Sequence, residues 1–271
     1  MIAGTAPARP HTRASLAAQF HALGVRPGAS VLVHAGLRGL GFLCGGPEAV
    51  VLALRDVLGP RGTLVVPTHT PENSDPADWT NPPVPADWWP VIRAELPGFD
   101  PAVTPSRFMG ALAELVRTWP GARRSDHPHV SFAALGPAAD RIVGDHALAG
   151  MLGEGSPLAR LYDLDGDVLL LGVDHGFNTS LHLAEYRQPA PPRQRCGAAV
   201  LTGDGGREWV WWDDVRLDDD GFARLGTGLE ATGAVRLGPV GDGTGRLMRQ
   251  RVAVDFAVDW LARNRRTEAG P

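Results

Sequence analysis

His182 and Glu185 are the first pair of side chains in this sequence whose types and spacing could move a proton. They lie in the stretch GVDHGFNTSLHLAEYR, residues 172–187. Residues three apart share a face if SLHLAEYR forms a helix. Imidazole titrates near neutral pH, so His182 is a candidate general base, and a carboxylate bonded to its other ring nitrogen would fix the tautomer. The alternative is a histidine with a purely structural role on a helix.

Asp174 and His175, in the same stretch, are candidates for a metal site. Together with His182 they would offer three ligands to a metal-dependent hydrolase. Their spacing matches no recognised zinc pattern. We therefore expect no metal, and the hydrolase is kept as an alternative.

Two acidic residues, Asp213 and Asp214, follow the aromatic run WVWW at 209–212. Aromatic rings can stack on sugar faces, and carboxylates can hold ammonium groups. The combination therefore suits a cleft for an amino-sugar. A polar turn after a hairpin strand would give the same pattern.

Residues 34–46, HAGLRGLGFLCGG, form a glycine-rich loop between a predicted strand and a predicted helix. Free backbone N–H groups and the helix dipole suit a phosphate group there, and Arg38 adds a positive charge. The loop is neither a Walker loop nor a GxGxxG fingerprint, so a tight structural turn explains it equally well. PSRFMG at 105–110 is a second candidate anion site, and RRSDHPHVSF at 123–132 could line a cofactor cleft.

The elements that must hold these residues follow a βαβ order. Residues 30–37 and 62–68 are nearly continuous apolar runs typical of buried strands, and residues 47–59 between them are bounded by Pro and Gly as a helix would be. Such a unit implies parallel strands with a right-handed crossover. The remaining predicted elements are strands at 130–136 and 167–173, helices at 12–23, 110–121, 156–164 and 246–266, and a helix start at 138–145.

The predicted fold is α/β, with a mostly parallel central sheet flanked by helices and a smaller antiparallel β appendage. Residues 198–215 alternate apolar and polar side chains around GDGG, which is a hairpin signature, and the appendage would span about 196–245. Residues 69–105 are rich in Pro, Asp, Asn and Trp, and we expect a lid-like loop. All 271 residues are assigned to one domain. His182 follows the strand at 167–173, at the end where open α/β sheets bind ligands.

The composition argues against several classes of function. The net charge is −4, so no nucleic acid or other polyanion is expected as a partner. No apolar run approaches membrane-spanning length and the N-terminus lacks the apolar segment of a signal peptide, so we expect no membrane contact. The two cysteines form no disulfide framework, and a cytoplasmic location is the simplest interpretation. The pattern does not indicate an oligomeric state.

Five blocks of sequence follow one another between about residue 20 and residue 190. They are VHAGLRGLGFLCGGPEAVVLALRDVLGPRGTLVVPT, SDPADWTNPPVPADWW, RSDHPHVSFAALG, GEGSPLARLYDLDGDVLLLGV and HGFNTSLHLAEYR. Together they resemble the aminoglycoside 3-N-acetyltransferases, members of the antibiotic N-acetyltransferase family, whose fold differs from that of the GNAT acetyltransferases. Several independent blocks in the right order make this resemblance specific.

The resemblance implies acetyl transfer. The donor would be acetyl-coenzyme A and the acceptor the 3-amino group of the 2-deoxystreptamine ring of an aminoglycoside, which would give antibiotic resistance. The general base of the family is the histidine of the HLAE helix, which falls on His182. An acid about thirty residues downstream assists it; Asp213 is the best positional match, and Asp214 and Glu185 remain open. Direct transfer in a ternary complex would need no cysteine or serine nucleophile.

The resemblance also implies which residues bind the two substrates. Carboxylates of residues 69–105 would hold ammonium groups, and the loop after the first strand would hold the phosphates of coenzyme A. Relatives commonly carry Ser-Ser where this chain has Ala35-Gly36, so backbone amides and Arg38 would replace hydroxyl contacts. The residues expected to bind the aminoglycoside are Asp75, Asp78, Trp79 and Asp214, and those expected to bind acetyl-coenzyme A are His34, Ala35, Gly36, Leu37, Arg38, Ser106, Arg107 and Ser131.

Three alternatives to this function differ in chemistry. The first is an N-acetyltransferase of the same fold that acts on a different amine metabolite. The second is the metal-dependent hydrolase described above. The third is a non-catalytic protein that binds coenzyme A or an aminoglycoside without turnover.

Overall fold

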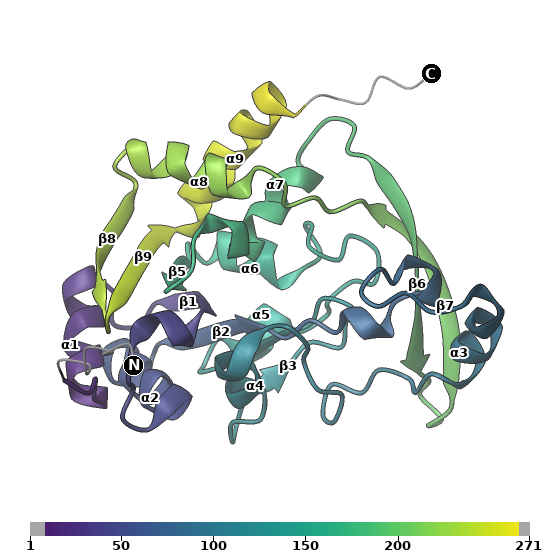
Figure 1. Cartoon of the computed structure of the whole chain (residues 1–271), viewed down its shortest axis with the longest axis horizontal. Helices are drawn as coiled ribbons and strands as arrows, with labels where there is room; N and C mark the ends of the chain where they lie inside the picture. Colours follow the sequence, from purple (N-terminus) through teal and green to yellow (C-terminus); the bar gives the residue numbers. More distant parts are fainter. Residues whose placement is uncertain (1–8, 266–271) are drawn as a thin grey trace, which may run out of the picture.

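A seven-stranded sheet forms the centre of the protein (Figure 1). The computed structural model describes residues 9–265. The strand order is β3-β4-β2-β1-β5-β9-β8, so β1 lies in the middle with β2 and β5 beside it. The strands are β1 (Ser30–Ala35), β2 (Thr63–Pro67), β3 (Arg123–Arg124), β4 (Phe132–Leu135), β5 (Asp167–Leu171), β8 (Val235–Val240) and β9 (Gly243–Arg249).

The three central strands run parallel and the outer strands run antiparallel. β1 pairs in parallel with both β2 and β5, which confirms the predicted βαβ unit and its parallel strand pair. β4 and β9 run antiparallel to their inner neighbours β2 and β5. β4 also forms an antiparallel pair with the short strand β3 on its other side. The sheet is therefore mixed, with a parallel centre.

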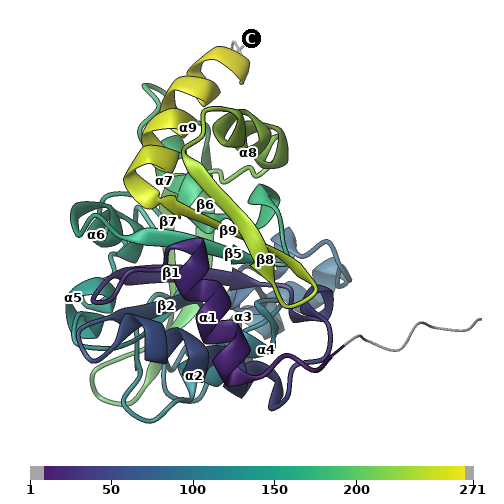
Figure 2. The same cartoon turned by 90° about the vertical axis from the view of Figure 1, so that its left-hand side faces the viewer.

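Helices cover both faces of this sheet. α1, α2 and α4 pack on one face, and α5 to α9 pack on the other. Figure 2 shows α2 below the sheet and α9 above it. The helices on the two faces are α1 (Arg13–Leu23), α2 (Gly46–Leu58), α4 (Gly110–Arg117), α5 (Ala139–Val143), α6 (Pro157–Asp163), α7 (His182–Tyr186), α8 (Phe222–Ala231) and α9 (Gln250–Asn264).

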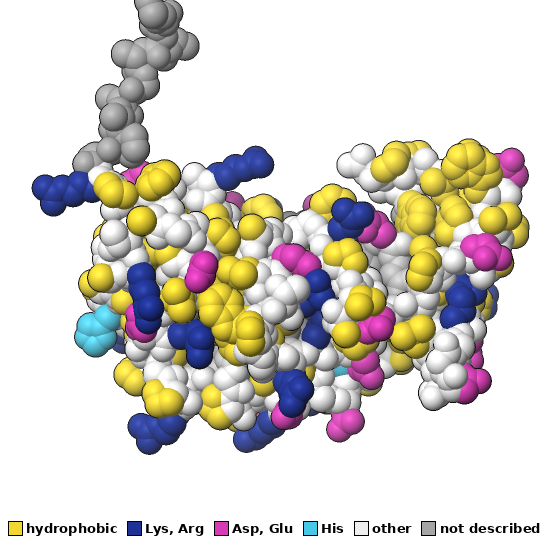
Figure 3. All heavy atoms as spheres, turned by 90° about the horizontal axis from the view of Figure 1, so that it is seen from below, with side chains coloured by type: hydrophobic (Ala, Val, Ile, Leu, Met, Phe, Trp, Pro, Cys, Tyr) yellow, Lys and Arg dark blue, Asp and Glu magenta, His cyan; other side chains and the backbone are white. Residues whose placement is uncertain are grey.

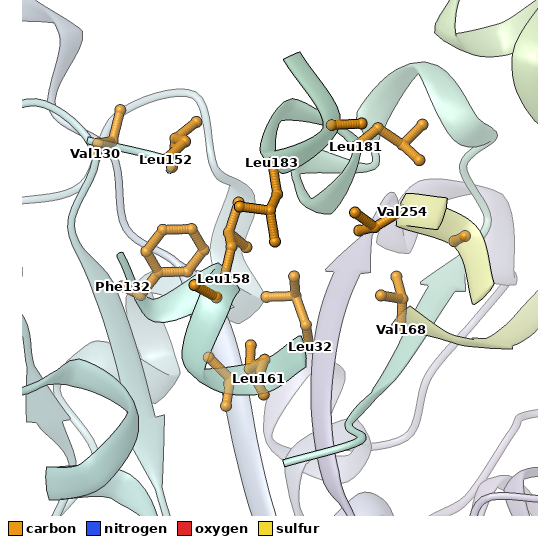
Figure 4. Close-up of a cluster of buried hydrophobic side chains, with 14 of the residues drawn as sticks. Leu32, Val130, Phe132, Leu152, Leu158, Leu161, Val168, Leu181, Leu183 and Val254 are labelled. Atoms are coloured by element: carbon orange, nitrogen blue, oxygen red, sulfur yellow. The ribbon is translucent and has the colours of Figure 1, made fainter. Parts of the chain in front are cut away.

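Successive residues of the central strands enter two different cores. In β5, Val168 packs into the core on the side of α7 and α9, whereas Leu169 packs into the core on the side of α1 and α2. Because both faces are covered, the strand has the continuous apolar sequence DVLLL. Figure 4 shows the first of these cores, where Leu183 of α7 lies near Leu158 and Leu32. This packing holds α7, and with it His182, against the sheet.

Residues that the sequence marks as helix ends do cap helices. The Thr12 hydroxyl accepts a hydrogen bond from the Ser15 backbone N–H, and Ser15 Oγ in turn accepts one from the Thr12 N–H, which forms a capping box before α1. Gly24 ends the same helix with φ of 102°, a left-handed conformation that suits glycine. Local sequence therefore determines where α1 begins and ends.

A separate two-stranded sheet projects beside the main body (Figure 1). It consists of β6 (Arg193–Leu201) and β7 (Arg207–Val215), joined by the predicted turn, and so confirms the hairpin. The helix α3 (Trp89–Glu95) lies next to it. The Arg207 guanidinium donates hydrogen bonds to the backbone carbonyls of Arg93, Ala94 and Leu96, at 2.6, 2.7 and 2.8 Å, and so ties α3 to the hairpin.

Three predicted segments differ from the structure. Residues 69–105 are not one irregular loop, because they contain α3 and three short 3₁₀ turns, Pro71–Asn73, Pro76–Asp78 and Ala86–Trp88. The separate β sheet ends at Val215, and β8 and β9 join the main sheet instead of extending the appendage to residue 245. The C-terminal helix begins at Gln250, because residues 246–249 complete β9. Apolar alternation alone did not reveal these strands, of which β8 lies at the edge of the sheet and β9 lies between β8 and β5.

No helix within residues 9–265 combines the length and the apolar character needed to cross a membrane.

Candidate active site

A cavity of 390 Å³ opens at the carboxyl ends of β1 and β2. Open α/β sheets bind ligands at this end of their parallel strands. Its wall comes from four regions: the ends of the two strands, the start of α4, the segment between β5 and α7, and the turn before α8. The side chains that the argument below uses are His34, His69, Phe108, His182 and Asp219.

His182 lies in the wall of this cavity, and one of its ring nitrogens contacts a carboxylate of the protein. Its Nδ1 is 2.5 Å from Oε2 of Glu185, which is one helical turn away on α7. The Glu185 carboxylate is buried, and the His182 side chain is 16% exposed. An ionised carboxylate accepts the Nδ1 proton, which leaves the Nε2 lone pair of a neutral imidazole free to accept another proton. A histidine oriented in this way by a carboxylate has the geometry that a general base requires.

The local sequence before His182 explains how the ring is placed. The Asn178 side chain accepts hydrogen bonds from the Ser180 backbone N–H at 3.2 Å and from its hydroxyl at 2.6 Å. Asn178 is thus the N-cap residue of this segment. It caps a 3₁₀ turn, Thr179–Leu181, and the α-helix proper begins only at His182. The ring of Phe222 packs against the imidazole, with centroids 5.0 Å apart.

Two further histidines of the cavity, His34 and His69, have buried Nε2 atoms that meet no hydrogen-bond partner among the described residues. Burial, with the nearby His182 as a smaller cause, lowers the pKa of His34 to about 3. The pKa of His69 is lowered to about 3 for the same reasons. Both rings are therefore neutral at physiological pH, and each offers one nitrogen to a bound molecule. His34 was predicted; His69 was missed, although it follows the strand VVPT just as His34 ends its own strand.

The carboxylate predicted to assist His182 was misplaced. Asp213 and Asp214 are successive residues of β7 and therefore point to opposite faces of the hairpin. Asp213 is exposed, whereas Asp214 is buried and accepts hydrogen bonds from Gly150 N at 2.8 Å and from the Tyr186 hydroxyl at 2.7 Å. Asp214 thus ties the hairpin to the main body. Of the three open candidates, it is Glu185 that contacts His182.

Asp75, predicted to hold a substrate ammonium group, is already paired with a positively charged side chain of the protein, Arg93. Its buried carboxylate accepts hydrogen bonds from the guanidinium of Arg93 at 2.8 and 3.0 Å and from Ala77 N at 2.9 Å. Asp78 remains exposed; partial burial and the charge of Asp75 raise its pKa. The Trp79 indole donates to Ser74 Oγ at 3.1 Å. The sequence could not show that Asp75 meets an arginine eighteen residues later.

Asp219 is an acidic residue of the cavity wall that the sequence analysis missed. It is exposed and lies in the run DDDG that precedes α8. The acidic run was the available signal, but nothing in it indicated contact with the cavity. More broadly, Figure 3 shows acidic side chains more numerous toward the end of the molecule with α3 and the hairpin.

The predicted cofactor loop lies partly in the cavity. His34, Ala35 and Gly36 line it, whereas Leu37 and Arg38 belong to the 3₁₀ turn Leu37–Leu40, and Arg38 is exposed. A Cβ at Gly36 would lie 2.8 Å from Val173 Cγ1. The chain carries glycine at this position because the turns after β1 and β5 approach each other closely.

The other three predicted cofactor residues make internal contacts. Ser106 donates from its N–H and hydroxyl to Glu114 at 3.0 and 2.7 Å. The guanidinium of Arg107 pairs with Glu72 at 2.7 Å on the surface. Ser131 is buried and donates to the Thr68 carbonyl at 2.8 Å. None of the three lines the cavity.

The neighbouring residue Phe108 does line the cavity, although the sequence gave no sign of it. Its side chain is 81% exposed and its φ of 62° is unusual for a residue other than glycine. An exposed aromatic ring at a cavity mouth offers an apolar surface to a ligand.

The proposed metal ligands do not come together. His175 is buried and its Nε2 lies 3.1 Å from Glu230 of α8, whereas His182 contacts Glu185. The Asp174 carboxylate accepts the Gly176 N–H at 2.9 Å. Within residues 9–265, the group of acidic or histidine side chains close enough to share an ion is Asp218–Asp220, and all three are exposed.

Comparison with known proteins identifies relatives over almost the whole chain. A family model described as aminoglycoside 3-N-acetyltransferase matches residues 32–262. The chain is 40% identical to the SPbeta prophage-derived aminoglycoside N(3')-acetyltransferase-like protein YokD of Bacillus subtilis (strain 168), covering 94% of each chain. It is 38% identical to aminoglycoside N(3)-acetyltransferase VII of Streptomyces paromomycinus, covering 97% of this chain and 95% of the relative.

Solved structures agree with these matches. The crystal structure of YokD superposes with a TM-score of 0.92 at 40% identity, covering 94% of this chain and 95% of that one. AAC-IIIb, in a binary complex with CoASH, gives a TM-score of 0.85 at 33% identity and covers 97% and 100%. AAC-VIa bound to sisomicin gives 0.84 at 32% identity and covers 95% and 100%.

Proposed function

Because this chain belongs to the aminoglycoside 3-N-acetyltransferase family, we propose that it transfers the acetyl group of acetyl-coenzyme A to the 3-amino group of the 2-deoxystreptamine ring of an aminoglycoside. Acetyl-coenzyme A is the cosubstrate, and the AAC-IIIb structure contains CoASH. The observation that carries the proposal is the buried carboxylate of Glu185 on Nδ1 of His182, at the wall of the cavity.

His182 is the general base of the proposed reaction. An aminoglycoside amine is largely protonated at neutral pH and must lose a proton to attack the thioester carbonyl. That first proton goes to solvent and leaves a neutral amine. As the neutral amine attacks, Nε2 of His182 takes a second N–H proton from the nitrogen, and Glu185 stabilises the resulting imidazolium. When the tetrahedral intermediate collapses, the C–S bond breaks and the imidazolium returns the proton to the departing thiolate, which gives the amide and coenzyme A thiol. Such assistance is worth roughly 10²- to 10⁴-fold in rate.

Transfer is proposed to be direct, with both substrates bound together. Cys44 is exposed and Cys196 is buried, and neither lines the cavity. Burial raises the pKa of the Cys196 thiol to about 11, so it is a poor thiolate nucleophile at neutral pH. An intermediate acyl-enzyme is therefore not needed and has no candidate cysteine at the site.

Neutral His34 and His69 are proposed to meet the reacting thioester. Each has one buried Nε2 without a partner, and a neutral imidazole N–H there can donate to the oxygen that becomes negative in the tetrahedral intermediate. His34 is near the carboxyl end of β1, and His69 follows β2 by two residues, so both line the cavity at the same end of the sheet. Arg38, exposed on the turn beyond Gly36, is proposed to meet the phosphates of coenzyme A.

Asp219 replaces Asp75 as the proposed partner of a substrate ammonium group. Its carboxylate is exposed at the cavity wall, whereas Asp75 and Asp214 are committed to internal hydrogen bonds. Asp78 and Asp213, both exposed, are proposed to assist more distant amines.

An acetyl-transfer panel with matched variants tests this proposal. Purified enzyme is mixed with acetyl-coenzyme A and a set of aminoglycosides, and release of the coenzyme A thiol is followed. His182→Gln should lower kcat by roughly 10²-fold or more, and Glu185→Gln should also lower it. His175→Gln serves as the control, because His175 is a buried histidine with its own glutamate but outside the cavity. Near-full turnover in His182→Gln with folded protein would rule out His182 as the base.

A second candidate function is acetylation of a different amine by the same site. Two of the three carboxylates expected to bind the aminoglycoside, Asp75 and Asp214, are occupied by internal contacts, which leaves fewer charges for a polycationic antibiotic. Under this alternative the panel would show no aminoglycoside-dependent thiol release, whereas simpler primary amines would be acetylated and His182→Gln would still abolish that activity.

A further inference from the structure

We propose that Arg265, the residue that follows α9, is a positioning residue for the His182–Glu185 pair. Its guanidinium donates a hydrogen bond to Oε1 of Glu185, while His182 takes Oε2 of the same carboxylate. Arg265 lies eighty residues from Glu185 in the sequence and beyond residue 262, where the match to the family model ends. The inference rests on the proposed function, in which His182 is the base.

The contacts of Arg265 reach both side chains that touch the His182 ring, Glu185 and Phe222. The same guanidinium donates to the backbone carbonyl of Asp218, whose N–H donates to Oε1 of Glu185 at 3.1 Å. It also lies over the ring of Phe222, 5.9 Å from its centroid, and Phe222 packs against the imidazole. Segments from α7, α8 and α9 therefore converge on one carboxylate through this arginine.

The burial of Glu185 explains why a cation is needed. A carboxylate that is 1% exposed has lost its water and favours the protonated form unless charge and hydrogen bonds compensate. A protonated Glu185 would lose the charge that stabilises the imidazolium during catalysis. Arg265 supplies a positive charge and one hydrogen bond to Oε1, while its second donor is held by the Asp218 carbonyl, so it favours the ionised carboxylate and keeps Oε2 aimed at Nδ1.

The sign of a pH effect follows from the charges around the pair. The groups that face it are His34 and His69 across the cavity, Asp218 and Asp219 from the turn before α8, and Arg265. Removing Arg265 takes away a positive charge and leaves the others in place. A pair that loses a neighbouring cation holds its dissociable proton to higher pH, whichever of the two side chains carries it.

The test compares three variants in the intact enzyme. Arg265→Gln removes the charge, and Arg265→Lys keeps the charge but not the two-pronged geometry. Arg263→Gln removes an exposed charge two residues earlier, in the last turn of α9. For each, kcat and kcat/KM are measured across pH 5.5 to 9 by thiol release, with KM for acetyl-coenzyme A and the melting temperature. The His182 ring-nitrogen NMR signals, assigned by their loss in His182→Gln, are followed over the same range without substrate.

In Arg265→Gln we expect kcat at neutral pH to fall about tenfold, with KM for acetyl-coenzyme A within twofold of wild type. The acid limb of kcat/KM and the pH at which the His182 ring signals change should both move up by about one pH unit. Arg265→Lys should restore the acid limb while recovering only part of kcat, and Arg263→Gln should match wild type in both.

Three outcomes would overturn the inference. The first is that the acid limb of kcat/KM in Arg265→Gln lies at the same pH as in wild type. The second is that Arg263→Gln shifts the acid limb by the same amount as Arg265→Gln. The third applies if Arg265→Gln does not fold, and it is that Arg265→Lys has the kcat of wild type. The NMR titration needs no turnover, so it separates this inference from the proposed function: an inactive wild type whose ring signals still shift in Arg265→Gln would contradict only the function.

Discussion

Acid should destabilise this protein through histidines that are buried in neutral form, and His146 offers the cleanest test. Its Nδ1 lies 3.0 Å from Ser125 Oγ and its Nε2 lies 2.6 Å from the Met151 carbonyl. Burial lowers the pKa of His146 to about 4, and that of His129 likewise to about 4. In the unfolded chain a histidine has a pKa of about 6.5, so at pH values between these limits the unfolded state binds more protons.

The sign and size of the effect follow from this difference. A histidine whose folded pKa is depressed contributes its full stability above the unfolded pKa and loses it as the pH falls from about 6.5 toward the folded value. Between pH 7.5 and pH 5.5, one such histidine lowers the free energy of unfolding by about 1.4 kcal/mol. His34 and His69, with pKa values of about 3, and His129 add similar amounts, so the four together approach 6 kcal/mol, a large part of a typical total stability.

The assay is urea unfolding at pH 7.5 and pH 5.5, followed by tryptophan fluorescence. Trp212 of the hairpin lies 4.9 Å from the His129 ring between centroids, so it reports on this region. His146→Gln can keep a side-chain donor to the Met151 carbonyl but cannot titrate. The difference in unfolding free energy between the two pH values should therefore shrink by about 1.4 kcal/mol in His146→Gln. The control is His21→Gln, which removes an exposed histidine and should change nothing.

Two results would refute this reasoning. If His146→Gln lost as much stability as wild type between the two pH values, His146 would not be the neutral buried group that its contacts indicate. If the wild type itself lost less than about 1 kcal/mol, the buried histidines as a set would titrate near their ordinary pKa values.

Two further predictions concern acidic residues that the structure has reassigned. Asp219→Asn should raise KM for an aminoglycoside about fivefold at low salt with kcat nearly unchanged, because one exposed charge pair contributes about 1 kcal/mol, and the effect should be smaller at high salt. Steady-state kinetics measure this, with Asp213→Asn as the control. Equal KM values for the two variants would contradict the prediction. Asp75→Asn should lower the free energy of unfolding by about 1–3 kcal/mol, because it breaks a partly buried pair with Arg93. Urea unfolding measures this, and a variant as stable as wild type would show that the pair contributes little.

Much of the framework was predictable from short-range patterns. The apolar runs at 30–37 and 62–68 became β1 and β2, and Gly24 and Asn178 act as caps where such residues usually do. His182 and Glu185 are three residues apart, so a helix alone brings them together. These features depend on the backbone geometry of a few neighbouring residues, which the amino-acid types bias directly.

The rest of the site depends on how distant elements cross, and the sequence did not reveal it. Asp75 meets Arg93, Asp214 meets Tyr186, and Glu185 meets Arg265, each through packing between separate elements. By its distance along the chain, Asp213 was the best positional match for the acid that assists His182. In β7, however, its side chain points to the face of the hairpin opposite to that of the buried Asp214.

Strand direction is another feature that tertiary packing decided and local sequence did not. The apolar run VSFAALG was predicted as a strand, whereas RLMR, with an arginine at each end, was assigned to the C-terminal helix and instead completes β9. Nothing local specifies that β4 and β9 run antiparallel to their neighbours, because either direction satisfies the backbone hydrogen bonds of a strand. The sequence thus indicated most of the central elements and the two side chains, His182 and Glu185, whose types and spacing suit proton transfer. The tertiary structure decided which charges are already paired, and so which are free to act, because pairing depends on burial and on contacts between residues far apart in the chain.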